Sequence, residues 1–171
     1  MRAGLAVALA VLLGGVSPAD PAAEAPSDGW TSFAGTWSAS GRRQSIAVEG
    51  GSAAAVVEMS GAVVLTTGQG LSPGFRGEAI GFDDGQGLSL GRSVWTDDRG
   101  DRVFSRLRGE SLGTGKRVVG TITGGTGRYA GLVGEYSFTW QYVLSPSDEA
   151  GVVQGRATSL EGRVRRAGPS R

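Results

Sequence analysis

The chain has 171 residues, enough for one domain, and carries 17 Lys and Arg against 16 Asp and Glu, a formal net charge of +1. It contains no His and no Cys, which excludes a Ser-His-Asp triad, a cysteine nucleophile, a disulfide framework and zinc held by these residues. A near-neutral chain also lacks the basic excess with which nucleic-acid binders displace counterions, so we expect no nucleic-acid partner.

The N-terminal segment is typical of an export signal. One arginine precedes an apolar run of about 14 residues, which is shorter than the ~20 that a membrane-spanning helix needs. Ser17 and Ala19 fit the small-x-small cleavage rule, with Ala25 as a second candidate. The sequence therefore predicts a signal peptide over residues 1–19 and a secreted or periplasmic protein with no membrane contact after cleavage. A retained N-terminal anchor is the alternative.

The rest of the chain is predicted to form one domain over residues 33–166. Residues 20–32 are acidic and rich in Pro and Ala, which predicts a flexible linker, and residues 167–171 are predicted to be a disordered tail. Within the domain, about ten short runs rich in Val, Thr, Ser and aromatic residues alternate with glycine turns, and we expect some of them to merge. These candidate strands cover residues 36–40, 43–49, 53–60, 62–67, 74–82, 88–95, 101–109, 116–123, 135–144 and 152–164.

This pattern predicts an all-β fold. No window of the mature chain places apolar residues at helical spacing over three turns. Many short strands with tight turns, and no helices to cover a sheet, indicate a sandwich or a closed barrel. A barrel leaves no exposed strand edges, and glycines inside the strands suit strongly coiled barrel strands. We therefore expect a single closed antiparallel barrel of about eight strands.

The run "EYSFTWQYV" is the strongest strand candidate and carries an aromatic stripe. Period-two alternation puts Tyr136, Phe138, Trp140 and Tyr142 on one face. A stripe of this size must face a core, a cavity or a partner. Together with rings from two other runs, it supplies the candidate ligand-binding residues, which are Trp37, Phe104, Tyr136, Phe138 and Trp140.

One charged pair is the candidate for catalysis. Arg106 shares its strand face with Phe104, so an inward Phe104 would bring Arg106 inside as well. A buried arginine needs a carboxylate, and Glu78 is the partner that we expect. Most other charges in the strands should face solvent.

The segment "GGTGRYAGLVG", residues 124–134, raises the question of a nucleotide site. Its residues match the spacing G-x-G-x-x-A after a strand, but a dinucleotide site needs a helix next, whose N-terminus binds the pyrophosphate. A strand follows instead, so we expect no cofactor. The segment predicts a tight turn between two strands, with structural roles for Gly124, Gly125, Gly127 and Gly131.

The run "DDRGD", residues 97–101, offers three carboxylates around a glycine. Carboxylates are ligands that calcium prefers, but the remaining oxygens of a calcium loop are missing. A hairpin turn in which Asp side chains accept from backbone N–H groups explains the run better, and we expect no metal site.

Three segments resemble known barrel families. "GTITGGTGRYAGLVGEYSF" resembles a glycine segment of the allene oxide cyclase and dirigent barrel superfamily, and "VWTDDRGDRVFSRLRGE" resembles the hairpin that precedes it there. "FAGTW" resembles the opening strand of related calycin barrels. Over residues 33–165, the resemblance is closest to secreted bacterial members with an allene oxide cyclase-like barrel.

The resemblance implies an eight-stranded barrel, often trimeric, with an apolar pocket that opens at one end. In the plant cyclases the pocket holds an unstable epoxide, assisted by a Glu and an Asn-supported water. This sequence has no Asn, so that catalytic set does not carry over whole. Dirigent proteins use pocket Asp and Arg residues to steer radical coupling. The partners that the resemblance implies are a small apolar ligand and further copies of the chain.

Three functions remain open from the sequence. The first is a secreted, non-enzymatic barrel that binds a small apolar or aromatic ligand. The second is a cyclase-like or dirigent-like protein that steers ring closure or coupling of a bound apolar substrate. The third is a structural or oligomeric barrel with a filled core. An interior cavity of ~300 Å³ or more, the lower end for ligand sites, would favour the first two over the third.

Overall fold

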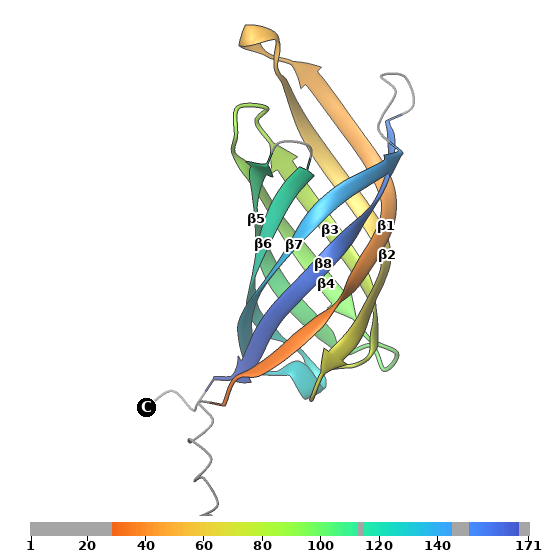
Figure 1. Cartoon of the computed structure of the whole chain (residues 1–171), viewed down its shortest axis with the longest axis vertical. Helices are drawn as coiled ribbons and strands as arrows, with labels where there is room; N and C mark the ends of the chain where they lie inside the picture. The colour runs from red at the N-terminus through yellow and green to blue at the C-terminus, as the bar shows by residue number, and fades with distance from the viewer. Residues whose placement is uncertain (1–28, 113–114, 145–150, 168–171) are drawn as a thin grey trace, which may run out of the picture.

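The structure is a computed structural model that describes residues 29–112, 115–144 and 151–167. The predicted signal peptide, most of the predicted linker and the tail from residue 168 onward lie outside these residues. Figure 1 shows the described part as a single barrel.

Eight strands make up the described domain. They are β1 (Thr31–Ala47), β2 (Ala53–Gly68), β3 (Gly74–Asp83), β4 (Ser89–Thr96), β5 (Arg102–Leu112), β6 (Gly115–Gly125), β7 (Leu132–Leu144) and β8 (Val152–Arg166). Each strand pairs antiparallel with the next one along the chain, and β1 pairs with β8, which closes the barrel. The only helical residues of the described part form two short 3-10 turns, η1 (Glu49–Gly51) and η2 (Gly127–Tyr129). The predicted all-β closed barrel of about eight strands is confirmed.

The first two strands are longer than predicted because each joins two of the candidate runs. β1 has 17 residues and β2 has 16, and they pair along almost their whole length as one long hairpin. The barrel also begins at Thr31 rather than Phe33, because Thr31 already pairs with Val164 of β8. At the other end of the domain, β8 ends at Arg166, two residues beyond the candidate strand 152–164.

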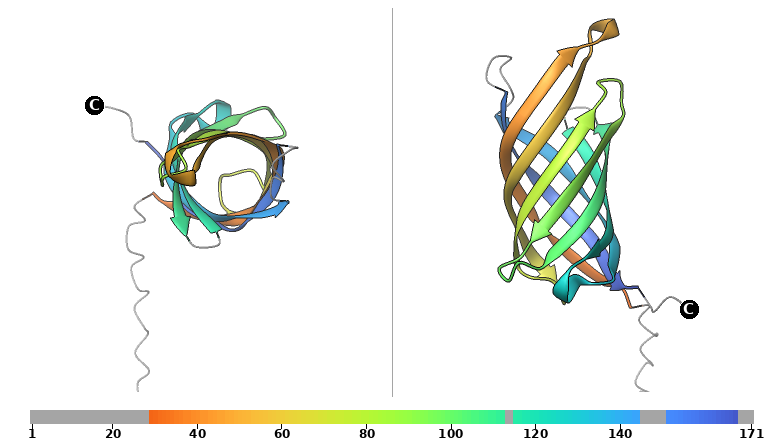
Figure 2. Two further views of the ribbon diagram at one scale, coloured as in Figure 1. Left: turned by 90° about the horizontal axis from the view of Figure 1, so that it is seen from above. Right: turned by 180° about the vertical axis from the view of Figure 1, so that it is seen from behind.

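The two ends of the barrel differ. At the end that we call the open end, β1 and β2 continue past the last residues that pair with β8 and β3, and residues 43–54 form a hairpin arm that Figure 1 shows rising above the rim. β1 starts and β8 ends at the opposite, closed end. The view along the barrel in Figure 2 shows the loop between β2 and β3 folded across this end.

Tyr129 fills the closed end. It lies on η2, in the turn between β6 and β7, and its side chain is fully buried. Its ring packs 5.7 Å from that of Phe75, centroid to centroid. The backbone N–H of Ser72, in the loop between β2 and β3, donates to the Tyr129 hydroxyl at 3.3 Å. The β2–β3 loop and the β6–β7 turn therefore both hold the Tyr129 ring at the closed end of the barrel.

An aromatic core occupies the interior next to the closed end. The Trp95 ring lies 4.8 Å from Tyr136 and 5.8 Å from Phe75, and Phe33 meets Trp95 edge-on at 6.2 Å. Aromatic rings in these arrangements contribute beyond the area that they bury. Buried aliphatic side chains complete this core, namely Val63, Leu65, Val103, Ile122, Leu132, Leu160 and Val164.

Glycines on the inner face let large rings lie against the barrel wall. A Cβ on Gly155 would lie 2.4 Å from Cζ2 of Trp140, and a Cβ on Gly162 would lie 2.6 Å from Cζ of Phe33. Any larger residue at these positions would displace the ring. The many glycines within the strands are thus complementary in shape to the few aromatic residues.

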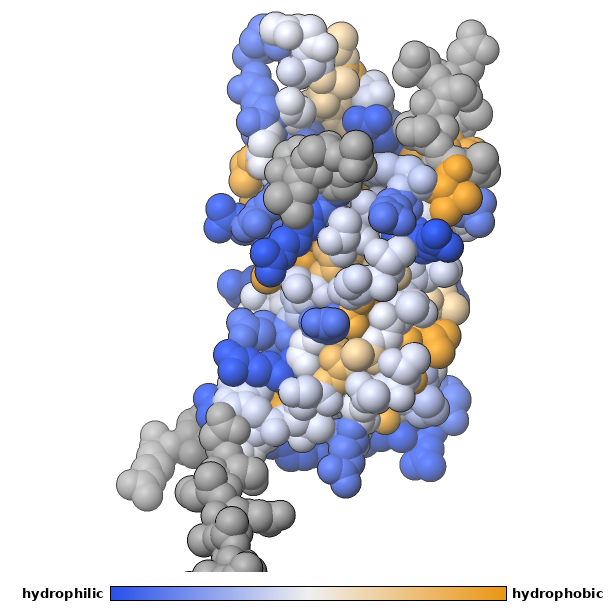
Figure 3. All heavy atoms as spheres, in the orientation of Figure 1, coloured by the Kyte–Doolittle hydropathy of each residue, from blue (hydrophilic) through white to orange (hydrophobic). Residues whose placement is uncertain are grey.

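The outer wall is polar, with apolar residues scattered over it. Figure 3 shows this mixture on the face over β6, β7 and β8. Glu135 pairs with Arg163 at 2.6 Å, and the guanidinium groups of Arg163 and Arg165 lie 4.7 and 4.8 Å from the ring centre of Trp30. Within the described ranges, the structure has no helix of the length and apolar character needed to cross a membrane.

Candidate functional site

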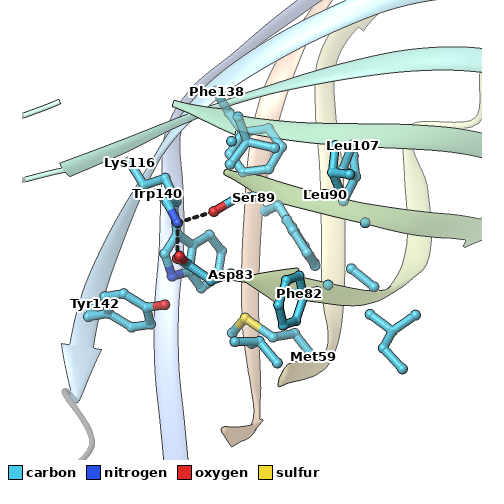
Figure 4. Close-up of a pocket in the computed structure, with 18 residues that line it drawn as sticks. Met59, Phe82, Asp83, Ser89, Leu90, Leu107, Lys116, Phe138, Trp140 and Tyr142 are labelled. Carbon is cyan, nitrogen blue, oxygen red and sulfur yellow. Dashed lines mark hydrogen bonds and ion pairs between the residues drawn. The ribbon is translucent and has the colours of Figure 1, made fainter. Parts of the chain in front are cut away.

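A cavity of about 130 Å³ lies inside the barrel at the open end. Large side chains from β1, β2, β5, β6 and β7 form its apolar wall, which consists of Trp37, Val57, Met59, Leu107, Val118, Phe138, Trp140 and Tyr142. Figure 4 shows these side chains converging on one space. On the other side, β3, β4 and β5 contribute the small residues Ala79, Gly81, Gly91 and Gly109 to the inner face, next to Leu107 and the polar Asp83 and Ser89. The space remains open because most of these residues are glycine or alanine and have little or no side chain with which to fill it.

Two tryptophans form the floor of the cavity. The rings of Trp37 and Trp140 lie 5.2 Å apart, and Phe138 stands edge-on to Trp37 at 5.7 Å. The tryptophans are only 5% and 6% exposed, and both indole N–H groups are buried without a hydrogen-bond partner among the described residues. An unpaired buried donor costs ~1–3 kcal/mol, and neither N–H has enough accessible surface to bond a molecule in the cavity.

Lys116 organises a polar rim at the mouth of the cavity. Its ammonium donates to the Asp83 carboxylate and, at 2.5 Å, to the Ser89 hydroxyl, as the dashed lines in Figure 4 show. Lys116 starts on β6, whereas its partners lie on β3 and β4, so the lysine side chain crosses β5. It crosses at Gly109, where a Cβ would lie 3.2 Å from Cδ of Lys116 and 2.8 Å from Cβ of Ser89.

The rim carries charge at neutral pH. Partial burial raises the pKa of Asp83, but hydrogen bonds from Lys116 and from the N–H of Gly85 outweigh burial and lower this pKa below its ordinary value. Asp83 is therefore a carboxylate. Burial raises the pKa of Tyr142, which stays a neutral phenol. A molecule that enters the cavity thus passes an ion pair and two hydroxyl groups.

The structure places the five predicted ligand-binding aromatics in three environments. Trp37, Phe138 and Trp140 line the cavity. Tyr136 also faces inward but lies deeper, in the packed core, where burial raises its pKa and its hydroxyl is 3.0 Å from that of Ser93. Phe104 lies on the outer wall, contrary to our expectation, because its neighbours Val103 and Ser105 are the buried, inward residues of β5.

The predicted pair of Glu78 and Arg106 does not form. Arg106 shares the outer face of β5 with Phe104 and is exposed to solvent. Glu78 lies on the outer face of β3 and pairs with Arg76 at 2.7 Å instead. The expectation for Arg106 depended on an inward Phe104, and strand alternation carries both residues outward together. Neither charged group reaches the cavity.

The sequence did not single out the residues of the rim. Tyr142 could have been found, because it continues the stripe of Trp140 by simple alternation. Lys116 had a weaker signal, since it is the one lysine in a chain whose other basic residues are all arginines. Asp83 and Ser89 had no signal of their own. They become site residues only through the pairing of β3, β4, β5 and β6.

The glycine segment and the aspartate run are both turns at the closed end, away from the cavity. Gly124, Gly127 and Gly131 have positive φ angles of 147°, 50° and 71°, which confirms the predicted turn, although Gly125 does not share this conformation. The Asp97 carboxylate accepts from the N–H groups of Arg99 at 2.8 Å and Asp101 at 3.0 Å. The hairpin turn predicted for the "DDRGD" run is therefore confirmed.

These two turns are joined by a buried ion pair. The Asp97 side chain is fully buried, and its Oδ2 accepts from Nε of Arg128 at 2.7 Å and from a terminal nitrogen of the same guanidinium at 2.6 Å. Burial raises the pKa of Asp97, but these bonds and the backbone N–H groups outweigh it and lower the pKa to about 2. The described part of the chain contains no group of three or more Asp and Glu placed to hold a metal ion.

Another hollow, of about 620 Å³, lies along the outer wall over β1, β6, β7 and β8. Of its four charged residues, Glu135 and Arg163 pair with each other, and Arg117 and Glu161 are exposed as well. Water solvates these groups, so they present no unmet hydrogen-bonding demand to a ligand. The cavity at the open end is the better candidate site, because its wall consists mostly of apolar and aromatic side chains.

The fold and the site define a class, namely a small closed antiparallel barrel with an aromatic core at one end and an apolar cavity with a charged rim at the other. No family model, no curated protein and no solved structure matches the chain. Membership of the allene oxide cyclase-like or dirigent-like superfamily therefore stays a prediction from the sequence motifs.

Proposed function

We propose that this protein is a secreted barrel that binds a small aromatic or apolar ligand in the cavity at its open end. The observation that supports this proposal best is an unfilled cavity walled by the aromatic side chains of Trp37, Phe138 and Trp140. A structural barrel would gain stability by filling such a space, since empty volume lined by apolar groups is destabilising.

The size of the cavity limits the ligand to about one ring. An apolar protein cavity of ~150 Å³ takes up benzene. The cavity here, of about 130 Å³, is close to that size. It is smaller than the ~300 Å³ that we expected of a ligand-binding or cyclase-like barrel, so that expectation is not met. A larger ligand would have to extend past the rim, toward the hairpin arm.

The two alternatives have less support. The packed rings near the closed end are what a filled structural barrel would show, but the open end contains an unfilled cavity. The cyclase-like or dirigent-like alternative comes from the motif resemblance, and Glu78 and Arg106, the pair expected to aid it, face solvent on the outer wall. Ligand binding is therefore the function that the geometry supports best.

A pair of Ala→Leu variants tests the proposal. Ala79 lines the cavity, whereas Ala62 lies on the outer face of β2, so Ala79→Leu fills the space and Ala62→Leu leaves it unchanged. Calorimetric titration with toluene should give saturable binding to the wild type and to Ala62→Leu, and none to Ala79→Leu. Failure of the wild type to bind toluene, or equal binding by Ala79→Leu, would reject the cavity as a ligand site.

A further inference from the structure

We propose that the rim selects an aromatic ligand that carries a carboxylate, with the ring in the cavity and the carboxylate on Lys116. This inference rests on the proposed function and narrows it to one chemical class. Three observations carry it, namely the path of the Lys116 side chain, the free N–H donor of its ammonium, and the positive charge of Arg43 near the rim.

The position of Lys116 is built into the strands around it. The side chain runs over Gly109, and Ser89 and Gly109 are directly paired across β4 and β5. Any side chain at residue 109 would meet both Ser89 and Lys116. The glycine therefore opens the route by which an amino group from β6 reaches the mouth of the cavity. A lysine that merely faced solvent would need no such route.

One hydrogen-bond donor at the mouth is free. An ammonium has three N–H donors, and two of those on Lys116 are used by Asp83 and Ser89. A ligand that takes up the third donor must bring an acceptor, and a carboxylate has acceptors only.

The positive charge near the mouth of the cavity also favours a ligand with a carboxylate. Arg43 lies on the inner face of the hairpin arm, opposite Val57 of the cavity wall, and its charge acts on Tyr142 at the rim. Its guanidinium has no ion pair or side-chain hydrogen bond with the residues that the structure describes. Arg43 thus adds a second positive charge near Tyr142, on the same side of the molecule as Lys116. A carboxylate on the ligand would be attracted by both cations.

Benzoate and benzamide test this inference, because they have the same ring and almost the same shape but differ in charge. Calorimetric titration at pH 7 should show benzoate binding at least about ten-fold more tightly than benzamide. Asp83→Asn removes the carboxylate that competes for Lys116 and should tighten benzoate binding. Lys116→Met should abolish the preference for benzoate over benzamide. Arg117→Met, which removes the adjacent cation on the outer wall, should leave the preference unchanged.

The wild type supplies a second measurement that does not depend on a variant folding. Lys116 is the chain's one lysine, so an amine-acylating reagent followed by mass spectrometry reports on its side chain directly. Benzoate should slow acylation of Lys116, and benzamide should not. Equal affinity for the two probes, or equal protection by them, overturns the inference. If toluene binds in either case, the proposed function survives, and if none of the three compounds binds, both proposals fail.

Discussion

The ring of Tyr136 occupies the space in which residue 120 would otherwise carry a side chain. Gly120 and Tyr136 pair across β6 and β7, and a Cβ on Gly120 would lie 2.2 Å from Cζ of the ring. The Tyr136 hydroxyl is held at 3.0 Å by that of Ser93 from the far side of the lumen. Because the ring is fixed on both sides, it cannot move away from an added atom without breaking the core.

Gly120→Ala should therefore destabilise the barrel, although it adds only one methyl group. Overpacking a well-filled core typically costs ~1–3 kcal/mol, and we expect a loss in this range in urea denaturation. Gly74→Ala is the matched control, since Gly74 is exposed on β3 and a Cβ there would meet nothing within 4 Å. Equal stability of the two variants would contradict the packing that we describe.

The stability of the barrel should fall at acid pH through Asp97. Its pKa is about 2 in the folded protein, against an ordinary value of 3.8. A lowered pKa means that the stabilisation is fully present above the ordinary value, and it is lost as the pH falls from about 4 through 2. Denaturant midpoints measured over this range should follow that decline.

Asp97→Asn should remove most of this pH dependence. It keeps the shape of the side chain but loses the charge that holds Arg128, and we expect it to cost about 2 kcal/mol at pH 7, as for a hydrogen bond to a charged group. Asp98→Asn is the control, because the Asp98 side chain is 77% exposed. If the wild type and Asp97→Asn lose stability in parallel between pH 4 and pH 2, another group is responsible.

Substitution of Gly127 should cost more than its backbone conformation alone explains. Gly127 and Gly131 both have positive φ, which β-branched residues tolerate poorly. A Cβ on Gly127 would also lie 1.8 Å from the Asp101 carboxylate, whereas one on Gly131 would meet nothing within 4 Å. Gly127→Val should therefore be less stable than Gly131→Val in thermal unfolding. Titration of the wild type with NAD should show no binding, because the turn ends in a strand.

Two tryptophans should differ in what their removal costs. Trp95 lies in the closed-end core, so Trp95→Ala should carry the full ~3–5 kcal/mol of a deleted packed aromatic. Trp140 borders a cavity that already exists, so Trp140→Ala should cost less and should let the enlarged space accept naphthalene. Calorimetry and chemical denaturation measure both effects. A full penalty for Trp140→Ala without naphthalene binding would show that the residue is ordinary core.

The stripe on β7 could be assigned to the interior from the sequence because four rings on one face cannot all meet water. Phe104 was assigned wrongly, because alternation alone shows which residues share a face but not which face is inside. The face of Phe104 also carries Arg102 and Arg106, and two arginines are a stronger outward signal than one ring is an inward signal. Weighing the whole face would have placed Phe104 correctly.

The rim could not have been predicted from the sequence by comparing the residues that share a strand face. Asp83, Ser89 and Lys116 belong to three strands, and no local pattern relates them. They meet because the register pairs Asp83 with Ser89 and Ser89 with Gly109, which leaves an open path from β6. Register depends on turn lengths and on packing of the whole barrel, so a site of this kind emerges only with the complete fold.

The pairing of β1 with β8 has a consequence for how the chain reaches its native state. Every other strand pairing joins neighbours along the chain, whereas this one joins Thr31 to Val164. Loop-closure entropy rises with the length of chain enclosed, so this contact is the most costly one to form and is expected to form last. Until it does, β1 and β8 each have one edge of unpaired backbone groups. The rings of Phe33 and Trp37 on β1 are then exposed to solvent. The interval before closure is therefore when the chain is most prone to aggregate.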